Sequence, residues 1–211
     1  MKNEEKILGL YVAHNDVMRP EFCAPFQQGD YVFATECHRV IRIAKDATSG
    51  DYVNAEKPNA LSVFILMSEE ITITKEEILS KLSEVELVPE TKTVGENIKC
   101  EECDGEGTVM WKYNTYEREY DCPVCYGSGY SSEERKIPTK NMIPDENGEI
   151  QLADKLFFVY NINSLLQTMD LIGVDEITMK HNANKPDEQA LFYFNKDVDV
   201  AVMPKLTNYC K

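Results

Sequence analysis

The chain has 211 residues, of which 43% are hydrophobic, and this size and composition fit one globular domain with a real core, or one domain that carries a small insertion. Its formal net charge of -15 argues against a surface that is broadly attracted to the phosphates of nucleic acids. The sequence has no apolar run long enough to cross a membrane and begins with too short an apolar stretch for a secretory signal, so we expect a cytoplasmic protein without a membrane partner.

The first part of the chain predicts a sheet and one helix. Residues 7–13 are apolar, but the run is too short to decide between helix and strand. Four further apolar runs predict strands: 31–35, 39–43, 61–67 and 71–73. The polar residues 36–38 form a corner between the first two of these strands. Thr74 and Glu77 form a capping box that predicts a helix from about 75 to 86, with one apolar stripe toward the sheet.

Two cysteine hooks follow, each with glycines behind it. They read Cys100-Glu-Glu-Cys103-Asp-Gly105-Glu-Gly107 and Cys122-Pro-Val-Cys125-Tyr-Gly127-Ser-Gly129. This spacing is typical of a structural zinc site, in which four thiolates leave no open position for water or substrate. Disulfides or a redox CxxC are the alternatives, but neither pair lies in a thioredoxin-like context. We therefore predict one structural zinc ion bound by Cys100, Cys103, Cys122 and Cys125.

The residues between the hooks predict a short hairpin with aromatic side chains: Val109, Trp111, Tyr113, Tyr116 and Tyr120. We interpret these side chains as a small core over the metal, although they could equally offer a protein-binding surface. The segment 99–135 is acidic, which makes it a poor DNA-reading zinc finger and favours a protein partner. The polar stretches on either side, 89–98, 131–135 and 138–148, predict linkers.

The last part of the chain predicts a βαβββ unit. It begins with a strand at 155–160 and a helix at 162–172 that Gly173 stops. Three strands follow near 176–181, 190–195 and 198–203. A similar unit in the first half of the chain would make an internal duplication.

The repeated CxxCxGxG of residues 100–129 resembles the cysteine-rich region of DnaJ-type chaperones, in which such repeats pair to bind zinc. This chain has one pair of repeats and no J-domain signature. The resemblance therefore implies a zinc module, and chaperone activity does not follow from it.

Two other stretches are similar to the bacterial DNA polymerase sliding clamp, the beta subunit of the replicative polymerase. Ala13-His-Asn-Asp-Val-Met-Arg19 and Val32-Phe-Ala-Thr-Glu-Cys-His-Arg39 resemble that family's AHxDxR and ATDGHR segments, and residues 161–204 resemble the way its domains close. The resemblance implies an α+β, clamp-like fold with two βαβββ-type units and two helices on a curved antiparallel sheet. Residues 1–98 and 136–211 would form this discontinuous domain around a zinc-binding insertion at 99–135.

The resemblance implies a non-enzymatic, sliding-clamp-like protein associated with DNA replication. A ring would need several copies of a chain that supplies about one clamp domain, which implies a homo-oligomer. The helix at 75–86 carries Lys75 and Lys81 against four glutamates, and the helix at 162–172 has no basic residue, so DNA is a disfavoured partner and protein contacts are expected. The alternative is a zinc-module adaptor or chaperone-like binding protein without a DNA role.

No catalytic residue is predicted. His38 follows Cys37, but neighbours in an extended segment point to opposite faces, which argues against a nucleophilic pair. His14 and His181 stand alone, and neither a P-loop nor a GxGxxG motif occurs. The cysteines outside the hooks, Cys23, Cys37 and Cys210, are an odd number and fit a reducing compartment.

Overall fold

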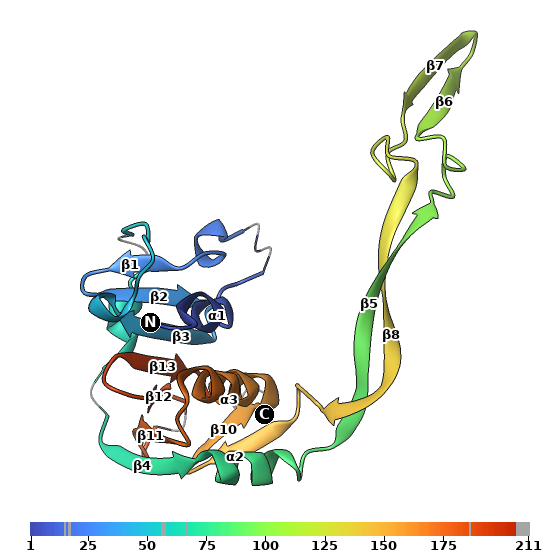
Figure 1. Cartoon of the computed structure of the whole chain (residues 1–211). Coiled ribbons are helices and arrows are strands. Elements are labelled where there is room, and N and C mark those ends of the chain that lie inside the picture. The colour runs from blue at the N-terminus through green and yellow to red at the C-terminus, as the bar shows by residue number, and fades with distance from the viewer. Residues whose placement is uncertain (15, 17, 56–57, 66, 186, 206–211) are drawn as a thin grey trace. The chain divides into compact units, whose positions relative to one another are not determined.

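The computed structural model describes the chain apart from residues 15, 17, 56–57, 66, 186 and 206–211, and it leaves the side chains of 93–98 and 131–136 undescribed. It divides into two compact units. The first unit comprises residues 1–86 and 144–211, and the second unit comprises residues 87–143. Each unit is described by itself, and the elements of both are labelled in Figure 1. Cys210 lies outside the described residues.

A seven-stranded antiparallel sheet organises the first unit. Its strands are β1 (Phe26–Gln28), β2 (Tyr31–Thr35), β3 (Arg39–Ala44), β4 (Glu69–Thr74), β11 (Glu176–His181), β12 (Ala190–Tyr193) and β13 (Val198–Val202). Their order in the sheet is β1-β2-β3-β13-β12-β11-β4. The last three strands of the chain therefore lie between strands from its first half. A separate hairpin pairs β9 (Glu149–Leu152) with β10 (Lys155–Phe158).

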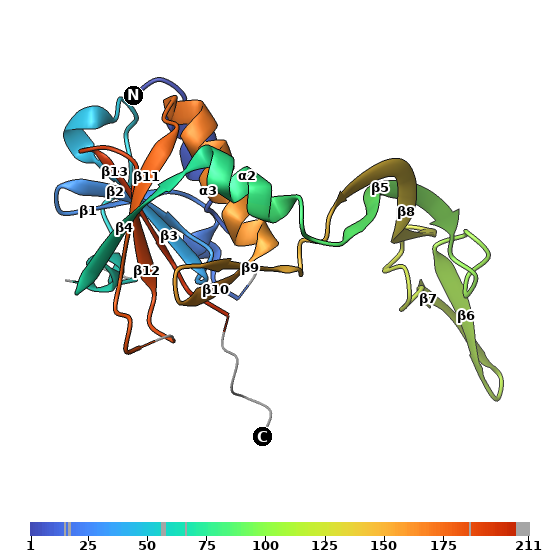
Figure 2. The same ribbon diagram turned by 90° about the horizontal axis from the view of Figure 1, so that it is seen from below.

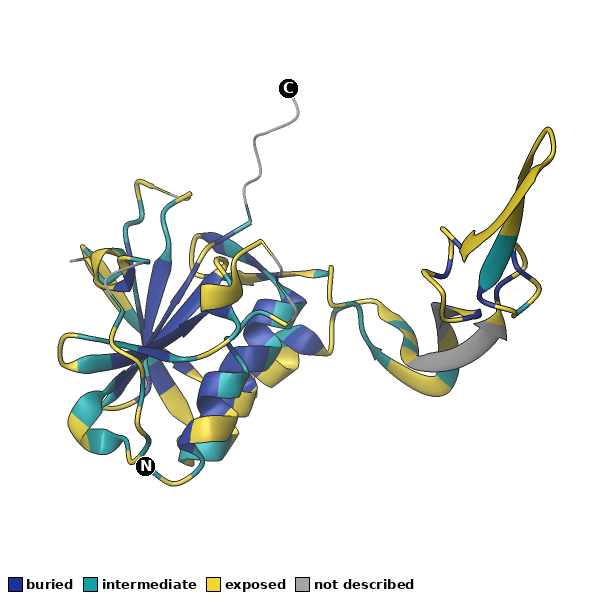
Figure 3. Ribbon diagram, turned by 90° about the horizontal axis from the view of Figure 1, so that it is seen from above, coloured by how far each residue is buried: buried dark blue, intermediate teal, exposed yellow. Residues whose placement is uncertain are grey.

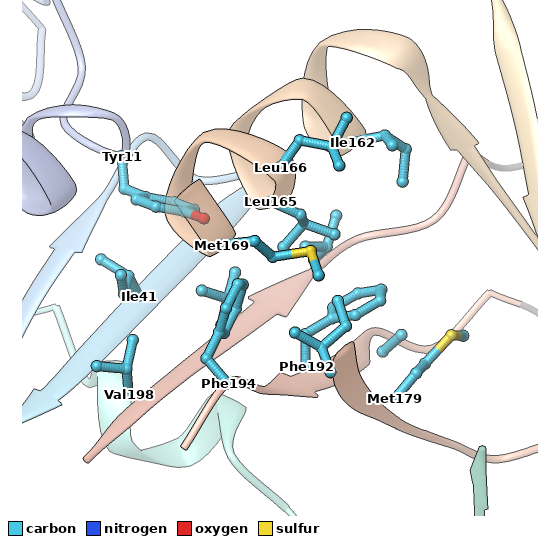
Figure 4. Close-up of a cluster of buried hydrophobic side chains, with 14 of the residues drawn as sticks. Tyr11, Ile41, Ile162, Leu165, Leu166, Met169, Met179, Phe192, Phe194 and Val198 are labelled. Carbon is cyan, nitrogen blue, oxygen red and sulfur yellow. The ribbon is translucent and has the colours of Figure 1, made fainter. Parts of the chain in front are cut away.

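Two helices, α2 (Lys75–Leu82) and α3 (Val159–Ile172), lie side by side on one face of the sheet (Figure 2). Strand residues alternate between the two faces, so Val32 and Ile41 join the core beneath the helices while Phe33 and Val40 join a smaller core on the opposite face. Figure 4 shows the larger core, in which Leu165 and Met169 of α3 point toward Phe192 and Phe194. The predicted α+β class is confirmed.

The two predicted helices are present with different bounds. Thr74 caps α2 as predicted, with its Oγ1 accepting a hydrogen bond from the Glu77 backbone N–H at 3.2 Å, but the helix ends at Leu82 rather than near 86. Beyond this end, Val85 packs against the core. Helix α3 begins three residues before the predicted start and ends at Gly173, whose φ of 82° stops it as predicted. Residues 155–173 and the strands that follow form the predicted βαβββ unit.

Only residues 7–9 of the undecided N-terminal run are helical. They belong to a short helix, α1 (Glu4–Gly9), in which Ile7 and Leu8 are buried. The strand predicted at 61–67 is wrong for the described residues of that range. A 3-10 turn spans Ala60–Val63, and the segment packs Ala60 and Phe64 over the outer face of the sheet. Two further 3-10 turns cover Pro20–Phe22 and Lys45–Ala47.

The second unit consists of two hairpin-like pairs of strands. Strand β5 (Leu87–Lys99) pairs with β8 (Tyr130–Pro144), and β6 (Thr108–Tyr113) pairs with β7 (Tyr116–Asp121). The prediction of linkers is therefore wrong for residues 89–98, 131–135 and 138–144, which lie in two strands that pair with each other and run in opposite directions (Figure 1), whereas residues 145–148 do lie outside the strands. The predicted hairpin between the hooks is present. Among the described helices, none is long and apolar enough to span a membrane.

A buried carboxylate joins α1 to the loop after β3. Glu4 is 4% exposed, and its oxygens accept hydrogen bonds from the backbone N–H groups of Ser49 and Gly50, from the Tyr52 hydroxyl and from the α-amino group of Met1. Burial acts to raise the pKa of this carboxyl, but these hydrogen bonds outweigh burial and lower the pKa from 4.5 to about 2.

Substitution Glu4→Gln is expected to lower the free energy of unfolding at neutral pH by about 2–4 kcal/mol. Because the folded-state pKa lies below the unfolded one, the carboxylate stabilises the fold fully above pH 4.5, and this contribution falls away as the pH drops toward 2. Urea unfolding at several pH values measures both effects. Glu5→Gln, at an exposed neighbouring position, is the control; equal stability of the two variants at pH 7 would contradict the prediction.

Candidate metal centre

The four cysteines of the two hooks form one buried cluster. The Sγ atoms of Cys100 and Cys122 are 3.8 Å apart, and those of Cys103 and Cys125 are 3.7 Å apart. All four sulfur atoms lie within 4.8 Å of one another, and none belongs to a disulfide. Zinc–sulfur bonds of about 2.3 Å in a tetrahedron place neighbouring sulfur atoms about 3.8 Å apart. The cluster is therefore able to hold a metal ion.

The two hooks have nearly the same hydrogen-bond pattern. In the first hook the Gly107 N–H donates to Cys103 Sγ at 3.2 Å, and in the second the Gly129 N–H donates to Cys125 Sγ at 3.3 Å. The hooks also bind each other reciprocally. Cys100 N–H donates to the Gly129 carbonyl at 3.0 Å, and Cys122 N–H donates to the Gly107 carbonyl at 2.8 Å. This exchange holds the two pairs of sulfur atoms against each other.

Glycine is required where the hooks cross. Gly107 and Gly129 have φ values of +80° and +75°, in the left-handed region that favours glycine. A Cβ on Gly107 would lie 2.5 Å from the Gly127 carbonyl oxygen, and one on Gly129 would lie 2.5 Å from the Gly105 carbonyl oxygen. The repeated glycines thus allow the backbones of the two hooks to approach each other closely.

The hydrogen bonds and burial also set the acidity of the thiols. Burial of Cys125 acts to raise its pKa, but the Gly129 N–H and the neighbouring thiols outweigh it and lower the pKa to about 7. Burial raises the pKa of Cys100 to about 11. A cation bound beside the four sulfur atoms would favour their thiolate forms.

The aromatic side chains of the hairpin do not cover the cysteine cluster. Val109 packs against the cysteines, whereas Trp111 is 66% exposed, Tyr113 78% and Tyr116 75%. Figure 3 shows the hairpin largely in the colour of exposed residues. The interpretation of these aromatic residues as a small core over the metal is therefore wrong.

The cysteine and the histidines that were considered as catalytic residues do not form a common site in the described part of the chain. Cys37 and His38 lie in the exposed corner after β2, where Arg19 Nη1 lies 2.8 Å from Cys37 Sγ. His14 is exposed, and the buried His181 has its Nδ1 2.8 Å from a carboxylate oxygen of Asp154. No two of these three histidines meet at one site in the contacts of the described residues.

Segments that resemble the sliding clamp in sequence come together at the corner between β2 and β3. Asp16 and Arg19 form an ion pair of 2.7 Å, and Arg19 reaches the corner at Cys37. The Met203 N–H donates to the His38 carbonyl at 2.9 Å, which joins the end of β13 to the same corner.

Arg39 continues this junction into the interior. It pairs with Glu36 at 2.9 Å, donates to Ser164 Oγ of α3, and lies over the Tyr11 and Tyr160 rings with its guanidinium carbon 5.6 and 5.2 Å from their centroids. Apart from Glu36, the neighbours of Arg39 come from distant parts of the chain, so no local sequence pattern marks this residue as a bridge.

No protein-family model matches the sequence, and the search of curated proteins gives no match. Among solved structures, the DNA polymerase III subunit beta of Pseudomonas aeruginosa is similar, with 12% identity and a TM-score of 0.47 over 97% of this chain and 64% of that one. The same subunit of Borrelia burgdorferi is 11% identical, with a TM-score of 0.49 over 98% of this chain and 63% of that one. A sliding clamp of Bartonella birtlesii is 12% identical, with a TM-score of 0.49 over 95% of this chain and 63% of that one. The chain thus spans less than two thirds of the length of these proteins.

Substitution Gly107→Ala is expected to disrupt the cysteine cluster, because it adds a Cβ 2.5 Å from a backbone oxygen at a positive φ. We expect a cost of more than about 3 kcal/mol to the second unit. Metal retained per chain after dialysis against a chelator measures the effect. Gly9→Ala is the control, since a Cβ there has no neighbour within 4 Å. Equal metal retention by both variants would show that the cluster does not require glycine where the two hooks cross.

Proposed function

We propose that this chain is a non-enzymatic, sliding-clamp-like binding protein that works beside DNA replication through protein contacts. The proposal is supported by one observation above all: the segments 13–19, 32–39 and 161–204, which resemble the sliding clamp in sequence, meet at a single corner of the sheet. Contacts of Arg19 with Cys37, of Arg39 with Ser164 and of Met203 with His38 join them there. We also propose that residues 1–98 and 136–211 form the clamp-like domain and that residues 99–135 form a module inserted into it.

Protein contacts are favoured over DNA by the charge of the helices. Helix α2 carries Lys75 and Lys81 against Glu76 and Glu77, and its Lys75 is paired with Asp170 of α3. Helix α3 has no basic residue. Such a surface has no excess of positive charge with which to attract a phosphate backbone.

For the cysteine cluster we propose one structural zinc ion bound by Cys100, Cys103, Cys122 and Cys125. Four thiolates form a soft donor set that suits zinc, and they close its coordination shell. The ion would hold the module together rather than take part in a reaction. A cytoplasmic location would keep the remaining cysteines reduced.

The second candidate function is an adaptor that works through the zinc module, with no role in replication. The exposed aromatic residues of the β6–β7 hairpin favour it. Deletion of residues 99–135 separates the two candidates. An adaptor loses partner capture while the first unit stays folded, whereas a clamp-type protein keeps those contacts that its first unit makes.

Light scattering after gel filtration, with and without duplex DNA at low salt, tests the clamp-type proposal. A ring requires self-association of several copies, so we expect an oligomer whose elution changes little when DNA is added. The charge reversal Glu76→Lys with Glu77→Lys should increase DNA retention, because it gives α2, which has two lysines and two glutamates, a net positive charge. A monomer in every condition would rule out a ring.

Metal analysis of protein purified without chelator tests the zinc proposal. We expect about one zinc per chain, and loss of the metal and of the hairpin's fixed structure in Cys103→Ser and Cys122→Ser. The control is Cys37→Ser, because that thiol is exposed and outside the cluster. An intact module that contains no metal would overturn the assignment.

A further inference from the structure

The β6–β7 hairpin has two chemically different faces. Residues that are directly opposite each other in an antiparallel pair share a face, and the register pairs Val109 with Tyr120, Trp111 with Arg118 and Tyr113 with Tyr116. One face is therefore aromatic with a single arginine. The pairs on the other face are Thr108–Asp121, Met110–Glu119 and Lys112–Glu117. That face is mainly polar and acidic.

Apart from Val109, which packs against the cysteines, the described residues of the two faces are not packed against a core. All six residues of β7 are exposed, and so are Trp111 and Tyr113 of β6. Exposed aromatic clusters of this kind are uncommon unless they serve recognition. The polar face makes only surface contacts, in which Lys112 Nζ lies 2.7 Å from Glu117 and Thr108 Oγ1 donates to Glu119 at 2.7 Å.

The outer edge of β7 is open. Within the described residues the sheet has only the strands β6 and β7, so the backbone N–H and C=O groups along the outer side of β7 have no strand beside them. An open edge is a template for a further strand. Along this edge Glu117, Glu119 and Asp121 point to one face, while Tyr116 and Tyr120 point to the other.

The charge of the module determines which kind of partner can bind at the β7 edge. Residues 100–129 contain seven carboxylates, at Glu101, Glu102, Asp104, Glu106, Glu117, Glu119 and Asp121, and two basic side chains, at Lys112 and Arg118. Four metal-bound thiolates would add further negative charge. A second copy of the module and a single-stranded nucleic acid are both repelled by such a surface, although either could stack on the aromatic rings. A cationic polypeptide is attracted.

We infer that the β7 edge binds an extended polypeptide segment in which lysine or arginine alternates with apolar residues. The segment adds as a third strand through main-chain hydrogen bonds. Its cationic side chains then lie on the face of Glu117 and Glu119, and its apolar side chains lie beside Tyr116 and Tyr120. This inference rests on the proposed protein-binding function and gives the chemistry of the partner for the hairpin.

The test uses the full, metal-loaded chain and a short blocked peptide of alternating lysine and valine or phenylalanine, labelled for fluorescence anisotropy. Three comparison probes complete it: a peptide of the same composition with its lysines and apolar residues in separate blocks, an alternating peptide with glutamate in place of lysine, and an oligothymidylate. Trp111 is the only tryptophan of the chain, so its emission reports binding at the hairpin itself.

We expect saturable binding of the alternating cationic peptide, a change in Trp111 emission, and weaker binding as salt is raised. The double variant Glu117→Gln with Glu119→Gln should weaken binding about fivefold, the size expected for two exposed charge pairs. Glu76→Gln with Glu77→Gln on α2 makes the same charge change in the other unit and should leave the affinity unchanged.

Equal binding of the block peptide would overturn strand addition, and unchanged binding by the Glu117/Glu119 variant would overturn the placement. Binding of oligothymidylate in place of the peptide would assign the aromatic face to nucleic acid and refute the inference. Metal content is measured in every sample. If a metal-loaded chain self-associates but does not bind the peptide, the peptide-binding inference is refuted and the clamp-type proposal is not. If the chain is monomeric, the ring is excluded, and the peptide-binding result at the hairpin is unaffected.

Discussion

The interleaved order of the central sheet is the constraint on which the rest of the first unit depends. Strand β13 pairs with β3 along Val198–Val202, and β11 pairs with β4, so the C-terminal strands complete a sheet that the N-terminal strands cannot close by themselves. The chain must therefore leave after α2 and return before β9 at nearly the same place. The Asp145 N–H donates to the Glu86 carbonyl at 2.9 Å, which ties the exit to the return. An insertion between these residues leaves the sheet unaltered.

The two units are stabilised by different means. The first has a core in which strands alternate their side chains between two buried faces, as Val32 and Phe33 do. The buried cluster of the second unit consists of the four cysteines, with Val109 packed against it. Burial of so little apolar surface does not offset the conformational entropy of ordering the hooks. The proposed metal ion would supply the stabilisation that packing does not, and the hydrogen bonds between the two hooks accordingly position sulfur atoms rather than an apolar interior.

Features with a local physical cause could be predicted from the sequence. The Thr74 cap, the Gly173 stop and the cysteine hooks each depend on a few neighbouring residues, and each lies where it was expected. The run at 61–67 is apolar like a strand, but its partner is the outer face of a sheet built from distant residues. The stretches that form β5 and β8 are polar, and their pairing depends on each other across the whole module rather than on periodicity. The contacts of Arg39 were hidden for the same reason.

The exposed hairpin poses a problem of folding as well as of recognition. Aromatic side chains on an open two-stranded sheet gain little from burial, and the free edge of β7 is a site at which copies of the chain can aggregate. Glu117 and Glu119 oppose this aggregation, because they repel the acidic β7 edge of a second copy. They do not repel a cationic strand. The same carboxylates thus prevent self-pairing and select a partner of opposite charge.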